Sequence, residues 1–92
     1  MPVFIIERHI PGAAKLTSDE LRDVSARSNE VVAGLGEPYT WITSYVAGDT
    51  VYCVHEAKDA ETIRRHATTC GLPADKITEV AAIIGPETGK NS

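Results

Sequence analysis

The feature that most constrains this chain is the stretch from residue 41 to 57, which predicts a β-hairpin. Residues 41–47 and 50–56 mix β-branched, aromatic and hydroxyl side chains, a composition typical of half-buried strands. Gly48-Asp49 lies between them and suits a two-residue type I′ or II′ turn. We therefore expect two adjacent antiparallel strands around which the other elements are arranged.

The register of this hairpin decides which side chains share a face of the sheet. With Gly48-Asp49 as the turn, the expected pairs are Ala47 with Thr50, Tyr45 with Tyr52, and Trp41 with Glu56. One face would carry Trp41, Thr43, Tyr45, Tyr52, Val54 and Glu56, and the other Ile42, Ser44, Val46, Val51, Cys53 and His55. The second set is small and mostly apolar, as a face beneath helices should be. A three-residue loop would instead place His55 beside Trp41.

The remaining elements complete a β-α-β-β-α-β order. Residues 3–9 and 77–84 predict the first and last strands. Helices are expected at residues 17–34, where Thr17 and Glu20 form a capping box, and at residues 59–70, which begin at Asp59 and end before Gly71. This order predicts an α+β, ferredoxin-like sandwich, with a four-stranded antiparallel sheet and two helices on one face.

Length and composition indicate a single domain. The chain has 92 residues and a net charge of -4, so we expect one domain over residues 1–85 and a flexible tail over 86–92. The charge argues against nucleic acid and anionic membrane as partners. No signal peptide or membrane span is evident. Cys53 and Cys70 form no CxxC pair and are interpreted as buried thiols of a cytoplasmic protein.

The predicted open face of the sheet gathers the side chains that could carry chemistry. Glu7 and His9 come from the first strand, and the hairpin adds Trp41, Tyr45, Tyr52 and Glu56. Imidazole, carboxylates and phenols can form a metal site or an acid-base site. Aromatic packing in a dimer interface is the competing interpretation. His9 and His55 lie near strand ends, where a histidine can simply be exposed, and His66, beside the apolar stripe of the second helix, is interpreted as a surface residue. No nucleotide-binding or hydrolase motif is present.

Glu56 is the carboxylate that this register singles out. Beside Trp41, Tyr45 and Tyr52 it would lose hydration, which makes it a candidate base or metal ligand. The alternative is that Glu56 accepts a hydrogen bond from a tyrosine and only fixes the interface. If His55 shares the face of Trp41 instead, the candidacy passes to His55.

Three segments carry a family resemblance: PVFIIERHIPG, VYCVHEA and AETIRRHATTCGLPADKITEV. They resemble a family of small bacterial ferredoxin-like domains of largely unknown function, one actinobacterial branch of which is nickel-binding. The resemblance spans residues 2 to 84. It implies a dimer formed through the sheets, and His9 resembles a histidine that ends the first strand in that branch. Arg8 and Leu72 stand where that branch has further histidines.

These observations predict a small metal-binding protein that works as a homodimer. His9, Glu7 and Glu56 are the expected ligands of nickel or another divalent transition metal, and Trp41, Tyr45 and Tyr52 are expected to line a small-molecule site. No nucleotide cofactor is expected, and binding is favoured over catalysis. The alternatives are a dimeric α+β barrel enzyme or small-molecule binder with an acid-base site on the sheet face, and a structural or interaction module.

Overall fold

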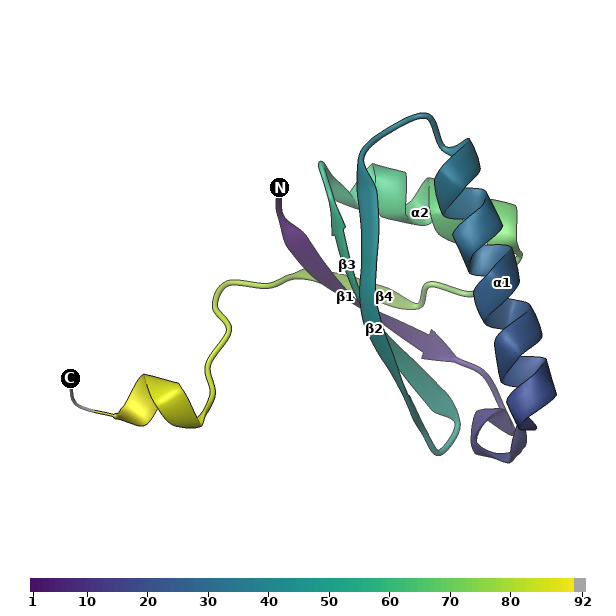
Figure 1. Cartoon of the computed structure of the whole chain (residues 1–92), viewed down its shortest axis with the longest axis horizontal. Helices are drawn as coiled ribbons and strands as arrows, with labels where there is room; N and C mark the ends of the chain where they lie inside the picture. The colour runs from purple at the N-terminus through teal and green to yellow at the C-terminus, as the bar shows by residue number, and fades with distance from the viewer. Residues whose placement is uncertain (91–92) are drawn as a thin grey trace.

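The computed structural model describes residues 1–90 and has the predicted order of elements. The strands are β1 (Val3–His9), β2 (Tyr39–Ala47), β3 (Thr50–Ala57) and β4 (Lys76–Glu79), and the helices are α1 (Ser18–Gly34) and α2 (Ala60–Cys70). Short 3₁₀ turns, η1 (Ala13–Lys15) and η2 (Pro86–Gly89), flank them. The strands form one antiparallel sheet in the order β2-β3-β1-β4. Both helices lie on one face of it (Figure 1), which confirms the predicted α+β, ferredoxin-like architecture.

Local sequence signals set the helix ends. Thr17 Oγ1 accepts a hydrogen bond from the Glu20 backbone N–H at 3.1 Å, and Glu20 Oε1 accepts one from the Thr17 N–H at 2.9 Å. This capping box satisfies two of the free N–H groups at the start of α1. Asp59 caps α2 by accepting from the Thr62 N–H at 2.8 Å. Gly71 ends α2 with φ of 72°, a left-handed conformation that favours glycine.

The core lies between the sheet and the helices. Phe4, Ile6, Tyr39, Cys53, Ala57 and Ile63 form its buried cluster. The alternation along β1 is regular, because Phe4, Ile6 and Arg8 are buried while Ile5 and His9 are exposed. Side chains of successive residues in a strand point to opposite faces, so the even-numbered residues of β1 face the helices. The odd-numbered residues face the open side.

The last strand is shorter than the sequence predicts. Residues 80–84 were expected to extend it, but β4 ends at Glu79. The reason is its neighbour: Glu79 pairs with Phe4, and the Val80 N–H donates to the carbonyl of Val3, where β1 itself begins. No strand of the described chain remains to pair with the following residues. They leave the body on the side away from the helices (Figure 1), with Ile83 and Ile84 about four-fifths exposed at 80% and 78%.

A β-bulge changes the register of the hairpin. The turn at Gly48-Asp49 is the predicted two-residue turn, since Ala47 pairs with Thr50 and Tyr45 with Tyr52. The pairing then shifts between Trp41 and Thr43, because Ile42 is an extra residue in β2. The expected pairing of Trp41 with Glu56 is therefore wrong: Trp41 pairs with His55 and Thr40 pairs with Glu56.

The bulge has a clear physical benefit. Without it, Thr40 and Ile42 would face the helices; with it, Tyr39 and Trp41 do. Tyr39 is buried, whereas Thr40 is exposed and Ile42 is 52% exposed. Burying the Tyr39 ring and part of the Trp41 ring in place of smaller side chains gains hydrophobic free energy of roughly 25 cal/mol per Å². That gain offsets one disrupted step of the strand ladder.

The C-terminal segment, expected to be a flexible tail, contains a short turn. Residues 86–89 form η2, in which Thr88 Oγ1 accepts a hydrogen bond from the Gly85 N–H at 3.0 Å. Residues 91–92 of the expected tail lie outside the described part of the chain. Over residues 1–90, no helix has the length and apolar character needed to cross a membrane.

Candidate functional site

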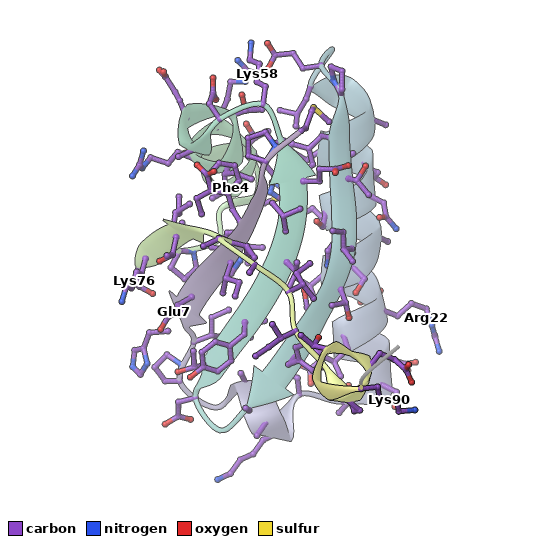
Figure 2. All side chains as sticks on the ribbon, turned by 90° about the vertical axis from the view of Figure 1, so that its left-hand side faces the viewer. Phe4, Glu7, Arg22, Lys58, Lys76 and Lys90 are labelled. Atoms are coloured by element: carbon purple, nitrogen blue, oxygen red, sulfur yellow. The ribbon has the colours of Figure 1, made fainter. Side chains whose placement is uncertain are left out.

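The open face of the sheet holds most of the predicted site residues. Figure 2 views the molecule from this side, with Glu7 and its strand partner Lys76 labelled next to each other. Glu7 pairs with Tyr52, which in turn pairs with Tyr45. Tyr45 is 63% exposed. This face therefore presents an acid and two phenols in one row across three strands.

The three predicted metal ligands are not brought together within one chain. His9 pairs with Thr50 at one end of β1, whereas Glu56 pairs with Val3 at the other end. Six residues of strand separate these positions, which is about 20 Å at the usual rise per residue. Glu7, two residues before His9 in β1, is closer to His9 than Glu56 is. Asp75 is a further acid close to His9, because its Oδ2 accepts a hydrogen bond from the His9 backbone N–H at 2.5 Å. Across residues 1–90, no group of three or more His, Cys, Asp or Glu side chains could hold a metal ion.

Trp41 does not belong to the open face. It shares the helix side with His55, and their ring centroids are 6.4 Å apart. The indole N–H of Trp41 donates to Ser44 Oγ at 2.8 Å, which fixes the ring. The expectation that Trp41, Tyr45 and Tyr52 line one site is therefore wrong. Glu56 therefore does not lie beside Trp41, one of the aromatic neighbours that made Glu56 a candidate base or metal ligand.

The helix side contains a buried polar cluster that the sequence interpretation missed. His55 and His66 are 1% and 0% exposed. His55 therefore lies beneath the helices, on the face where the favoured hairpin register puts it, whereas the surface role expected for His66 is wrong. His55 Nδ1 is hydrogen-bonded to the hydroxyl of Tyr39. His66 Nε2 lies 3.1 Å from Ser28 Oγ, and its ring stacks on Tyr39 with centroids 5.0 Å apart. Buried His66 Nδ1 has no hydrogen-bond partner in the described chain.

Burial keeps both imidazoles neutral. Loss of hydration lowers the pKa of His55 to about 3, and the charges of His66 and Arg8 act in the same direction. Loss of hydration also lowers the pKa of His66, with Arg8 again adding to the effect. It raises the pKa of Tyr39. At neutral pH, therefore, this cluster presents uncharged rings.

Among residues 1–90, Arg8 is the one buried side chain near the cluster that is a cation, since arginine is protonated throughout the physiological pH range. It is 2% exposed, because position 8 continues the buried alternation of Phe4 and Ile6 along β1. Its Nε donates to Cys53 Sγ at 3.4 Å and its Nη1 to the carbonyl of Pro73 at 2.6 Å. None of the four ion pairs found within residues 1–90 includes it.

A cavity of about 280 Å³ lies on this side of the sheet. Its lining combines residues of α1, such as Leu21, Val24 and Ser28, with residues of the sheet, among them Arg8, Trp41 and His55. Most of the wall is apolar. The cavity, which is partly open to solvent, therefore brings a buried guanidinium and the Trp41 indole into one space between α1 and the sheet.

Comparisons with known proteins agree with this fold. The crystal structure of SCO4226 from Streptomyces coelicolor A3(2) is 27% identical in sequence and superposes with a TM-score of 0.73. The alignment covers 89% of this chain and 99% of that one. No curated protein matches the chain. The model of the family described as nickel responsive protein SCO4226-like matches residues 4–80, most of the chain, and so this protein belongs to the SCO4226-like family of nickel responsive proteins.

Proposed function

We propose that this protein binds nickel on the open face of its sheet and works there as a homodimer. The observation that carries the proposal is that no helix covers this face in the described part of the chain (Figures 1 and 2), and that the face gathers His9, Glu7, Tyr45 and Tyr52. The description of the family as nickel responsive supports the choice of metal. Imidazole nitrogen suits nickel, and carboxylates can complete such a site.

His9 is the ligand around which the proposed site is built. Its side chain is exposed at the end of β1, and Glu7 precedes it by two residues on the same face. Asp75 adds a carboxylate beside the backbone of His9. Imidazole and carboxylate donors suit a divalent transition metal. Since one chain supplies few such donors at this place, we propose that a second copy completes the coordination.

The second copy also explains the apolar surface of this face. Ile5 and Tyr52 are each 38% exposed and Tyr45 is 63% exposed. The segment after β4 adds Ile83 and Ile84, and it leaves the body on the same side (Figure 1). An isologous sheet-to-sheet contact would cover these side chains in both copies. In such a dimer Glu56 of one copy could approach a site from which it is distant within its own chain.

The metal is tested by titrating Ni²⁺ into the wild type, His9→Ala and Glu7→Gln in a calorimeter. Both substitutions are on exposed or half-exposed side chains, so the fold should persist. We expect His9→Ala to weaken nickel binding at least roughly tenfold and Glu7→Gln to weaken it less. Glu61→Gln, an exposed acid on α2, is the matched control. Equal nickel affinity in the wild type and His9→Ala would reject His9 as a ligand.

The dimer is tested by light scattering at micromolar concentration, with and without Ni²⁺. We expect twice the mass of one chain for the wild type and for Ala26→Glu, an exposed position on α1. Tyr45→Glu places a charge in the proposed contact and should give the mass of one chain. A wild type that stays at the mass of one chain under all these conditions contradicts the homodimer.

A further inference from the structure

The cavity between α1 and the sheet has the architecture of a small-molecule site. Its volume of about 280 Å³ is far more than the roughly 10–15 Å³ that one water molecule needs. Leu16, Leu21 and Val51 are among the apolar residues of its wall. Small-molecule sites typically combine such a wall with a few placed polar groups. The cavity is on the opposite side of the sheet from the proposed nickel site, so the two sites are independent.

The charge of Arg8 points to the kind of molecule that fits. Its guanidinium lines the cavity while the residue is 2% exposed, and within residues 1–90 it has no ion pair. A buried charge without a counter-ion is costly. The bonds to Cys53 Sγ and to the carbonyl of Pro73 occupy two of its five N–H donors. The remaining donors can form the paired contacts that a guanidinium makes with a carboxylate.

The other polar groups of the lining do not neutralise Arg8. His55 cannot be a counter-ion, because an imidazole is neutral or cationic, and its pKa, lowered to about 3, leaves it neutral at neutral pH. Glu20 is an acid of the lining, but the residue is exposed and its Oε1 is engaged by the Thr17 N–H. Ser28 and Ser44 are neutral and are hydrogen-bonded to His66 and Trp41 respectively.

We propose that this cavity binds a small organic carboxylate, whose carboxylate group pairs with Arg8 and whose apolar body packs against Trp41 and α1. The apolar wall distinguishes this ligand class from inorganic anions. A phosphate or a chloride could neutralise Arg8, yet either would leave the wall around Leu21 and Val51 in contact with water. A carboxylate with an apolar body satisfies both parts of the cavity.

Octanoate is a suitable probe, because its head and body can be varied separately. It is titrated into the full chain and followed by calorimetry and by the fluorescence of Trp41, the single tryptophan of the chain, which lines the cavity. Octanol has the same body without the charge, and acetate has the charge without the body. We expect octanoate to bind at least roughly tenfold more tightly than either, with a change in Trp41 emission.

Variants separate this site from non-specific binding. Arg8→Met keeps an unbranched, mainly apolar side chain and removes the guanidinium with its charge, and it should weaken octanoate at least roughly tenfold while leaving octanol unchanged. Arg64→Met removes an exposed arginine of α2 and should change neither. Equal octanoate affinity in the wild type and Arg8→Met overturns the proposal, as does failure of octanoate to bind the wild type at millimolar concentration.

A second variant keeps the test decisive if Arg8→Met does not fold. Ser25 lines the cavity from α1 and is half-buried. Ser25→Phe fills part of the space and leaves Arg8 in place, so it should weaken octanoate and octanol together. Unchanged octanoate affinity in a folded Ser25→Phe protein would overturn the proposal.

Discussion

The two faces of the sheet are built from the same strands and differ in almost every chemical respect. The helix side holds two neutral imidazoles, and a partly open cavity there is bordered by one of them, His55, together with the Arg8 guanidinium and the Trp41 indole. The open side presents carboxylates, phenols and the exposed His9. Since neighbouring residues of a strand face opposite sides, Arg8 is buried between Glu7 and His9. A site on one face can therefore be altered without entering the other.

The largest expected effect is the loss of folding stability when a core residue of β1 on the helix side is truncated. Ile6 is 0% exposed and Ile5 is 38% exposed, so adjacent isoleucines allow a direct comparison. Ile6→Ala should lower the free energy of unfolding by about 2–5 kcal/mol, because it leaves a cavity in the core. Ile5→Ala should cost less than about 1 kcal/mol in dilute protein. Urea denaturation followed by circular dichroism measures both, and equal losses would contradict the assignment of the two faces.

The second largest effect is expected from acid, which should lower the free energy of unfolding through the two buried histidines of the helix side. The pKa of His55 and that of His66 are lowered in the folded protein, whereas an unfolded chain has histidine pKa values near 6.5. The unfolded state therefore binds more protons below about pH 6.5, so the stabilisation is full above that pH and is lost as pH falls toward about 3, the folded-state value for His55. The slope is up to about 1.4 kcal/mol per pH unit for each histidine.

This prediction is checked by urea titrations at several pH values between 7 and 5. His66→Gln cannot gain the same proton on unfolding, so its stability should depend less steeply on pH, even if it is lower at pH 7. A variant with the same slope as the wild type would show that His66 does not contribute.

A smaller effect is expected where α1 begins. Thr17→Ala removes the hydroxyl that accepts from the Glu20 N–H and should cost about 1 kcal/mol. Ser18→Ala changes the first residue of the same helix without removing the cap, and it should be near neutral. Because α1 forms a wall of the cavity and not of the open face, Thr17→Ala should leave the mass in light scattering unchanged. A lower mass would connect the cap to the proposed dimer.

Local signals in the sequence predict the parts of the fold that local physics determines. The capping box at Thr17, the turn at Gly48-Asp49 and the left-handed Gly71 depend on a few neighbouring residues, and all three are present. The bulge at Ile42 depends on how Tyr39 and Trp41 fit beneath the helices. No pattern within β2 determines that fit, so Trp41 and Glu56 were wrongly predicted to share a face of the sheet.

The buried polar residues were missed for a different reason. Arg8 continues the alternation of Phe4 and Ile6, and His66 follows Ile63 by three residues on the same helix stripe. Periodicity alone would have placed both in the core. The general preference of charged and imidazole side chains for the surface outweighed it. A charged residue on a buried stripe is thus a useful sign of an internal site.

The account rests on the face to which Trp41 belongs, and nuclear Overhauser effects measure this directly. The structure predicts contacts from the Trp41 indole protons to the ring of His55, whose centroid is 6.4 Å away, and to the side chain of Ser44, whose Oγ accepts the indole N–H at 2.8 Å. Contacts from the indole to Val3 and Glu56 instead would place Trp41 on the open face. That result would contradict both the bulge and the internal site.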